Sequence, residues 1–300
     1  MLPKRRSAGG VALLLVALGV YVFGCESRYA GRLVTPPPRP LIFAHRGFGV
    51  LGPDNSLWAA EHAFAAGMDG VDMDGQLTRD SEIVIFHDLS VDRLTAGTGR
   101  VRDLTRAQML GLDLGPKYDP KLSGANVHTF EEFVVAAQGR GILMVELKVP
   151  GLRATGIEQR AVDIIRRHEA YDYVLLSSFN PFVLRRVKRL DPRVRTVFIF
   201  MDTNWNAELL KEIKPEDRVD LPWIVRQEWI RRALRKFIRP DLLSINHEVD
   251  SAVTKRLIAK GWPVFIWTPD DDAAIRRALA KHPYGVISDQ AVRARELRGP

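Results

Sequence analysis

Two pairs of charged residues, each separated by a single position, lie at the ends of apolar runs. Asp72 and Asp74 form one pair, and Glu146 and Lys148 form the other. Residues two apart in a β-strand point to the same face, so both members of each pair project together. Three carboxylates without a thiolate make a hard oxygen site suited to Mg²⁺ or Ca²⁺, and without a cation they would raise their own pKa values.

Histidines and basic residues end the same kind of run. His45 and Arg46 close the first run, and His87 with Asp88 closes another. Two imidazoles that titrate near neutrality can donate one proton and accept another. Arg46 and Lys148 supply fixed positive charge for the non-bridging oxygens of a phosphodiester. A metal, paired histidines and basic side chains together indicate phosphoester cleavage.

The elements that must position these residues alternate between short β-branched runs and helical patterns, which predicts a parallel sheet wound by crossover helices. Eight such strands predict a (β/α)8 TIM barrel, whose catalytic groups lie where the strands end. The predicted strands are 40–44, 70–74, 142–147, 174–178, 195–200, 242–246, 263–268 and 284–288. A further run at 83–87 follows the second strand too closely for a parallel crossover, so we expect an antiparallel hairpin there.

Helices are expected between the strands, and Ser56 or Asn55 and Thr129 with Glu132 are suitable helix N-caps. The segment 89–127 is too long for a simple loop and is expected to form a lid-like insertion at the barrel mouth. The predicted helices are 56–66, 105–111, 129–138, 155–168, 180–190 and 270–281.

The first forty residues predict export. Basic residues precede an apolar run from Ala8 to Gly24, and about 17 residues is the lower limit for crossing a bilayer. The run is therefore an uncleaved anchor, or it belongs to a lipoprotein cleaved and lipidated at Cys25. Both readings place the body outside the cytoplasm. We expect a signal or anchor at 1–25, a Pro-rich linker at 26–40 and the barrel at 41–295.

Composition restricts the partners. The chain has 300 residues, 46% of them hydrophobic, and a net charge of +8 with a single cysteine. Disorder, an internal disulfide framework and a Cys-rich metal site are excluded. No nucleic-acid-binding motif accompanies the positive charge, so phosphate-bearing small molecules, lipids and the membrane are the expected partners. Protein partners are not identified by the sequence.

The ordered motifs resemble the glycerophosphodiester phosphodiesterase family across about residues 41–290. The motifs are His45-Arg46-Gly47, Pro53-Asp54-Asn55-Ser56, Gly70-Val71-Asp72-Met73-Asp74, Thr78-Arg79-Asp80, His87-Asp88 and Glu146-Leu147-Lys148, with lesser matches at Trp267-Thr268 and Ser288-Asp289. The resemblance implies a phosphoric diester hydrolase that releases an alcohol and glycerol 3-phosphate.

The resemblance also assigns roles. It implies that His45 and His87 are the acid–base pair, that Asp72, Asp74 and Glu146 bind the metal, and that Arg46 and Lys148 bind the phosphate. Asp54 and Asp88 are expected to support the site. The family usually has Glu at the positions of Asp54 and Asp72, so each carboxylate is retracted here by about 1.3–1.5 Å. Such a change can shift metal preference or admit a water molecule.

Several alternatives stay open. Asp54 could instead cap the following helix, and Trp267 could line the head-group pocket or be a packing residue. The basic amphipathic stretch 223–239 could bind anionic lipid or be a barrel helix with a solvated basic face. Lipid binding would favour lysophospholipase D-type cleavage. A third possibility is a binding or scaffold protein with a weakened metal site, which only Asp54 and Asp72 favour.

Overall fold

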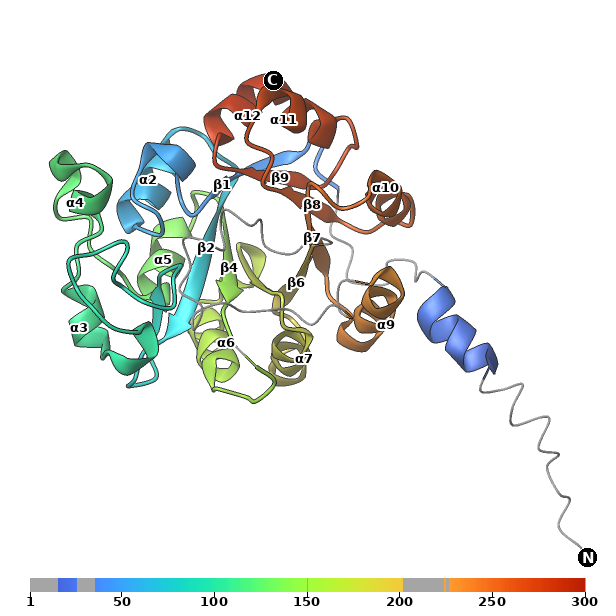
Figure 1. The fold of residues 1–300 in the computed structure, drawn as a ribbon, viewed down its shortest axis with the longest axis horizontal. Coiled ribbons are helices and arrows are strands. Elements are labelled where there is room, and N and C mark those ends of the chain that lie inside the picture. Colours follow the sequence, from blue (N-terminus) through green and yellow to red (C-terminus); the bar gives the residue numbers. More distant parts are fainter. Residues whose placement is uncertain (1–15, 26–35, 150, 202–223, 225–226, 300) are drawn as a thin grey trace, which may run out of the picture.

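The computed structural model describes residues 16–25, 36–149, 151–201, 224 and 227–299. Its central element is a closed barrel of eight parallel strands, with a ninth strand attached outside (Figure 1). The strands are β1 (Leu41–His45), β2 (Gly70–Leu77), β3 (Ile83–Ile85), β4 (Ile142–Leu147), β5 (Val174–Ser178), β6 (Arg195–Phe200), β7 (Leu242–Asn246), β8 (Val264–Trp267) and β9 (Gly285–Ser288).

The order of the barrel strands is β1-β9-β8-β7-β6-β5-β4-β2, and pairing of β1 with β2 closes the ring. The predicted parallel barrel is therefore confirmed. The hairpin is also present, because β3 pairs antiparallel with β2. β3 ends at Ile85 rather than at His87, since the carbonyls of the next three residues accept hydrogen bonds from the side chain of Gln76 instead of continuing the ladder.

Helices cover the outside of the barrel (Figure 1). They are α2 (Leu57–Ala65), α5 (Phe130–Ala137), α6 (Ile157–Arg167), α7 (Pro181–Leu190), α9 (Glu228–Ile238), α10 (Ser251–Ala259), α11 (Asp272–Leu279) and α12 (Ala291–Arg298). Ser56 caps α2 by accepting the backbone N–H of Ala59, and Thr129 forms a capping box with Glu132 at the start of α5. Both predicted caps are thus confirmed.

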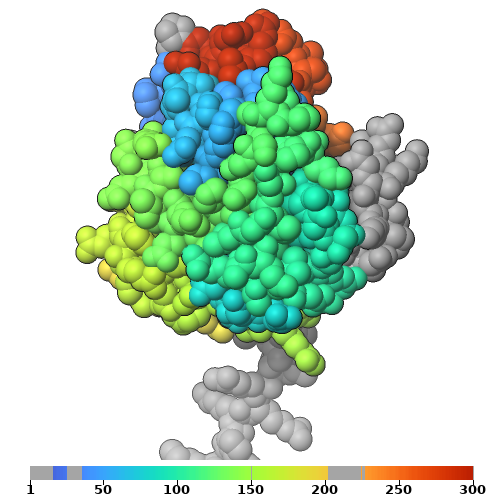
Figure 2. Space-filling view, turned by 90° about the vertical axis from the view of Figure 1, so that its left-hand side faces the viewer, coloured from blue at the N-terminus to red at the C-terminus, as the bar shows by residue number. Residues whose placement is uncertain are grey.

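The segment 89–127 packs beside α2 on one face of the molecule (Figure 2). It contains the short helices α3 (Arg106–Leu110) and α4 (Gly115–Tyr118). Its apolar side chains form a cluster of their own on the hairpin strand, which explains why this long segment has a defined structure. The cluster comprises Val84, Phe86, Val91, Val101, Met109, Leu114 and Val127.

Two apolar layers hold the barrel together. The larger layer fills the space between the strands and the outer helices. The smaller one fills the barrel interior, where side chains from successive strands meet. Its buried members are Phe43, Met144, Leu175, Val197, Leu242, Phe265 and Ile287. The inward-facing residues two positions further along β1, β4 and β5 are His45, Glu146 and Ser177, so the character of the interior changes from apolar to polar toward the strand ends.

The predicted N-terminal anchor lies partly outside the described residues. Residues 16–24 are helical and end in the turn η1 (Val20–Gly24). Among the residues that the structure describes, no helix is long and apolar enough to cross a bilayer. Anchoring therefore stays a prediction. Cys25 follows this turn as an exposed free cysteine.

The interior layer makes Gly70 a sensitive position. A Cβ at Gly70 would lie 2.5 Å from Cζ of Phe43 and 2.6 Å from the carbonyl oxygen of Ile142. Gly70→Ala is therefore expected to lower the free energy of unfolding by about 1–3 kcal/mol, through overpacking. Urea unfolding monitored by circular dichroism measures the loss. Gly111→Ala is the matched control, because the nearest atom to its Cβ is 3.5 Å away. An equal effect of the two substitutions would contradict the packing argument.

Candidate active site

His45 lies at the end of β1, and its ring is oriented by a residue from the opposite end of the chain. Its Nδ1 lies 2.7 Å from Oδ1 of Asp289, which directly follows β9. Because a carboxylate can only accept, Nδ1 carries the proton of this hydrogen bond and Nε2 remains for other chemistry. The backbone N–H of Asp289 in turn donates to Oδ1 of Asp270 at 2.8 Å. The pairing of β9 with β1 thereby fixes the orientation of the imidazole.

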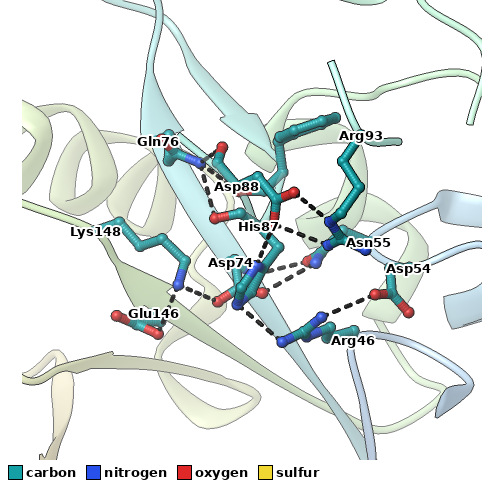
Figure 3. A network of polar contacts seen from close by, with 11 residues as sticks. Arg46, Asp54, Asn55, Asp74, Gln76, His87, Asp88, Arg93, Glu146 and Lys148 are labelled. Carbon is teal, nitrogen blue, oxygen red and sulfur yellow. Dashed lines mark hydrogen bonds and ion pairs between the residues drawn. The ribbon is translucent and has the colours of Figure 1, made fainter. Parts of the chain in front are cut away.

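His87 comes from the hairpin and has a similar partner (Figure 3). Its Nδ1 lies 2.7 Å from Oδ1 of the neighbouring Asp88, which is itself held by the guanidinium of Arg93 at 2.6 and 2.9 Å. The amide of Gln76 donates to the carbonyl oxygens of residues 86–88 and fixes the backbone. Both histidines therefore have a carboxylate on Nδ1, and Asp88 lies where the predicted supporting role requires it.

Arg46 connects the loop after β1 to the hairpin. Its Nη1 donates to Oδ2 of Asp54 at 2.9 Å, and its Nη2 lies 2.9 Å from Nε2 of His87. A guanidinium can only donate, so Nε2 of His87 is the acceptor and that imidazole is neutral. The helix-cap alternative for Asp54 is wrong, because Ser56 caps α2 and Asp54 instead pairs with Arg46.

Asn55 is a fully buried residue that positions Asp74. Its Nδ2 donates to Oδ2 of Asp74 at 3.0 Å, and its Oδ1 accepts the backbone N–H of Asp74 at 2.8 Å (Figure 3). Asn55 has φ of 59°, a left-handed conformation that Asn tolerates better than most residues. The reciprocal pair explains why an amide, rather than an acid or an aliphatic side chain, is suited to this position.

The three predicted metal-binding acids lie on the neighbouring strands β2 and β4. Asp74 is directly opposite Glu146 in the register, and Asp72 is opposite Met144. Nζ of Lys148 lies between two of the acids, 3.0 Å from Oδ1 of Asp74 and 3.2 Å from Oε2 of Glu146. The strand ends therefore bring Asp72, Asp74, Glu146 and Lys148 together, as we expected from their spacing.

The charges of these groups influence one another strongly. Burial raises the pKa of Asp72 to about 7, and the negative charges of Asp74 and Glu146 add to this effect. Burial likewise raises the pKa of Glu146. Asp74 is the exception, because Lys148, His87 and Arg46 outweigh its burial and lower its pKa. The three acids therefore differ in how readily they ionise, and Asp74 does so most readily.

The donor set fits a divalent cation in its chemistry. Burial and the neighbouring carboxylates raise the pKa of Asp72, and a bound cation would act against both effects. Carboxylate oxygens are the ligands that Mg²⁺ and Ca²⁺ prefer. As the side chains now lie, no three acidic, histidine or cysteine side chains in the described part of the chain are arranged to hold a metal. Lys148 instead bridges Asp74 and Glu146.

The two imidazoles have pKa values shifted in opposite directions. Burial lowers the pKa of His45, but the hydrogen bond and charge of Asp289 outweigh it, so the net pKa is raised above 6.5. Burial and the positive charges of Arg46 and Lys148 lower the pKa of His87 to about 3. The two imidazoles thus differ in basicity, with His45 the stronger base and His87 the weaker one.

Two further polar atoms on the inner surface have no partner among the described residues. They are Nε1 of Trp267, at the end of β8, and Oγ of Ser177, at the register position opposite Glu146. The ring of Trp267 also meets Phe179 edge to face, with centroids 5.8 Å apart. A buried indole N–H is costly when unpaired, so a substrate oxygen is a suitable partner for it.

The sequence indicated Asn55 only as an alternative helix cap, a role that Ser56 takes instead, and it indicated no role for Gln76 or Asp289. Asp289 was part of a motif without an assigned function. Asp289 directly follows the last barrel strand, so the rule that selected the other strand ends could have selected it too. Nothing in the sequence indicated the contacts of Asn55 and Gln76, because both depend on the tertiary arrangement of the loop and the hairpin.

The parallel barrel with acids, histidines and basic side chains at its strand ends defines a hydrolase of phosphate esters. Comparison with known proteins is more specific. Residues 45–293 match the glycerophosphoryl diester phosphodiesterase family. The chain belongs to this family and is a phosphoric diester hydrolase.

Individual relatives agree with the family. The chain is 33% identical over 163 residues to a glycerophosphodiester phosphodiesterase of Caldanaerobacter subterraneus, covering 54% of this chain and 67% of the relative. It is 40% identical over 175 residues to a probable glycerophosphodiester phosphodiesterase of Mycobacterium tuberculosis, covering 53% and 64%. An Oleispira antarctica phosphodiesterase, solved with the product sn-glycerol-3-phosphate, has the same fold, with a TM-score of 0.70 at 23% identity over 86% of this chain and 96% of that one.

The contact between Asp289 and His45 yields a prediction. Asp289→Asn is expected to lower the pKa of His45, because burial then acts without the full charge of its partner. An NMR titration of the imidazole resonances measures this pKa. Asp272→Asn, on the outer helix α11, is the control that should leave it unchanged. An unchanged His45 titration in Asp289→Asn would contradict the assigned contact.

Proposed function

We propose that this chain hydrolyses glycerophosphodiesters to an alcohol and glycerol 3-phosphate, using a divalent cation and the pair His45 and His87. The observation that carries the proposal is the pair of histidines, each with a carboxylate on Nδ1, at the same barrel end as the acids Asp74 and Glu146. The family supports the substrate class, and the product bound to the Oleispira relative supports glycerol 3-phosphate as the product.

In the proposed step, a hydroxyl oxygen attacks phosphorus and the bond from phosphorus to the leaving alcohol breaks. Neutral His87 takes the proton of the attacking hydroxyl at Nε2, once Arg46 has moved its donor to the phosphate. Protonated His45 gives a proton to the leaving oxygen. The step balances in protons and charge, because His87 gains one proton and His45 loses one. The attacking oxygen belongs either to water or to the neighbouring hydroxyl of the glycerol. Attack by the glycerol hydroxyl gives a cyclic phosphate, which water then opens.

Arg46, Lys148 and Trp267 are proposed to bind the substrate. Arg46 and Lys148 each have a carboxylate partner, which keeps the cationic group beside the site until the phosphate arrives and the donor turns toward it. Trp267 presents an indole N–H that has no partner in the described structure. Donors placed in this way are suited to the negative charge that grows on the phosphate oxygens during attack.

Asp72, Asp74 and Glu146 are proposed to hold Mg²⁺ or Ca²⁺. The bound cation would polarise the phosphoryl oxygens and neutralise charge in the transition state. For the protein, this requires Lys148 to turn from Asp74 and Glu146 toward the substrate phosphate. The short side chain of Asp72 favours a site with room for an additional water molecule.

We also propose that residues 1–25 anchor the barrel to a membrane, with residues 26–40 as the linker and the catalytic body outside the cytoplasm. The basic residues before Ala8 and the apolar run that follows support this orientation. Lipidation at Cys25 would give the same location.

Replacing either histidine tests the acid–base proposal. His45→Ala and His87→Ala are each expected to lower kcat for glycerophosphocholine by about 10²- to 10⁴-fold, with little change in KM, because each moves a proton in the transition state. His62→Ala, on the exposed face of α2, is the matched control. Because His45 acts as the acid, activity should fall as the pH rises through its raised pKa.

The same assay separates the competing functions. Turnover of lysophosphatidylcholine without turnover of glycerophosphocholine would overturn the proposed substrate. Silence on both substrates, with metal present, would indicate a binding protein instead of an enzyme.

Removing the metal tests the cation proposal. EDTA is expected to abolish activity, and Mg²⁺ or Ca²⁺ should restore it. Asp72→Asn should weaken metal binding, measured by isothermal titration calorimetry, on the order of 10- to 100-fold. Asp103→Asn, on the exposed surface of the insertion, is the control. Full activity in EDTA, together with no heat of metal binding, would exclude the proposed site.

A further inference from the structure

An exposed aromatic surface extends over α7 and α9, outside the active site. We call it the α7–α9 face and define it by Phe182, Trp229 and Phe237, which are 38%, 43% and 42% exposed. Phe182 and Phe237 meet edge to face with centroids 5.8 Å apart, so the surface is continuous across the two helices. Aromatic rings left exposed in such a group indicate a binding surface.

The N-terminal apolar segment packs against α9 (Figure 1). The ring of Phe23 meets Trp229 edge to face at 5.4 Å. Nζ of Lys236 donates to the carbonyl oxygens of Val22 and Cys25 at 3.0 and 2.6 Å, and Nη1 of Arg232 donates to that of Gly24 at 2.8 Å. These cations satisfy the carbonyls at the end of the helical segment, which fixes its last turn on α9.

Tyr21 contacts α9, because its ring centroid lies 4.7 Å from Nζ of Lys236. The apolar side chains before it are left exposed. Val16, Leu18 and Val20 are 56–63% exposed, and the sequence before them is also apolar from Ala8 onward. The barrel therefore leaves these side chains uncovered, whereas hydrocarbon would cover them. The aromatic surface begins where this uncovered segment meets the barrel.

The charge of the two helices favours an anionic partner. α7 and α9 together contain eight basic residues and a single acidic one, although Arg186 and Lys188 already pair with Glu158 and Asp241 outside these helices. That acid, Glu228, already pairs with Arg231 and Arg235, which are buried. The predicted alternative of a solvated basic face is therefore wrong for these two arginines. Arg189 and Arg239 remain exposed at the ends of the helices.

We propose that the α7–α9 face rests on an anionic lipid bilayer, beside the place where the N-terminal segment enters it. Exposed aromatic rings with basic side chains around them suit the boundary between lipid head groups and hydrocarbon. The barrel then has one fixed orientation toward the membrane instead of rotating on a linker. This inference rests on the proposed anchoring, and it adds the surface that contacts lipid.

A fluorescent probe tests this proposal on the full chain. In a Cys25→Ser background, Phe237→Cys or Phe182→Cys is labelled with the polarity-sensitive fluorophore NBD. The protein is reconstituted into phosphatidylcholine vesicles with or without phosphatidylglycerol. Val135→Cys is the control, because Val135 is 54% exposed on α5, across the barrel from α9 (Figure 1).

We expect a blue-shifted emission and quenching by spin-labelled lipids at positions 237 and 182, stronger with phosphatidylglycerol, and neither effect at position 135. If the protein floats with the vesicles but the NBD emission at positions 237 and 182 does not shift, the proposed lipid contact is overturned and the anchoring is retained. Protein that does not float with the vesicles, either in this background or with Cys25 retained, overturns anchoring and this proposal together. A shift that depends on protein concentration in detergent without lipid assigns the surface to a second copy and overturns the lipid proposal. Hydrolysis of glycerophosphocholine in each sample tests the enzyme separately.

Discussion

The structure of the site depends on one electrostatic constraint, the burial of three carboxylates on two neighbouring strands. Asp72, Asp74 and Glu146 cannot all remain ionised without positive charge beside them. Lys148 and Arg46 supply positive charge that lowers the pKa of Asp74, whereas burial and the neighbouring acids raise that of Asp72. Asn55 adds hydrogen bonds to Asp74.

The barrel was predictable because its strands have a simple pattern. Four buried strands match their predicted bounds, 142–147, 174–178, 195–200 and 242–246, since a parallel strand buried on both sides is a short apolar run with clear ends. β2 is longer than predicted, because its pairing with β3 continues it to Leu77 after the apolar run has stopped. Hydrogen bonds that the Gln76 side chain donates likewise determine where β3 ends, and an apolar pattern contains no information about such a contact.

Much of the site also followed from strand ends, because the carboxyl ends of parallel strands meet at one rim. The side chains of His45, Asp74, Glu146 and Lys148 lie there as expected. Their partners were harder to predict. Asp289 is 244 residues from His45 in the sequence, and the Asn55–Asp74 pair needs a left-handed residue in a loop. Such contacts result from closure of the barrel and from loop geometry, so no local pattern indicates them. The same holds for the burial of Arg231 and Arg235, which a helical pattern would place in solvent.

The contact between His45 and Asp289 crosses the seam at which the first and last barrel strands join. A chain that emerges gradually during synthesis or export therefore lacks the partner of His45 until its final strand is inserted. Partly completed or C-terminally shortened chains would have a misoriented imidazole even if every other site residue were present. The orientation of His45 is in this way tied to completion of the barrel.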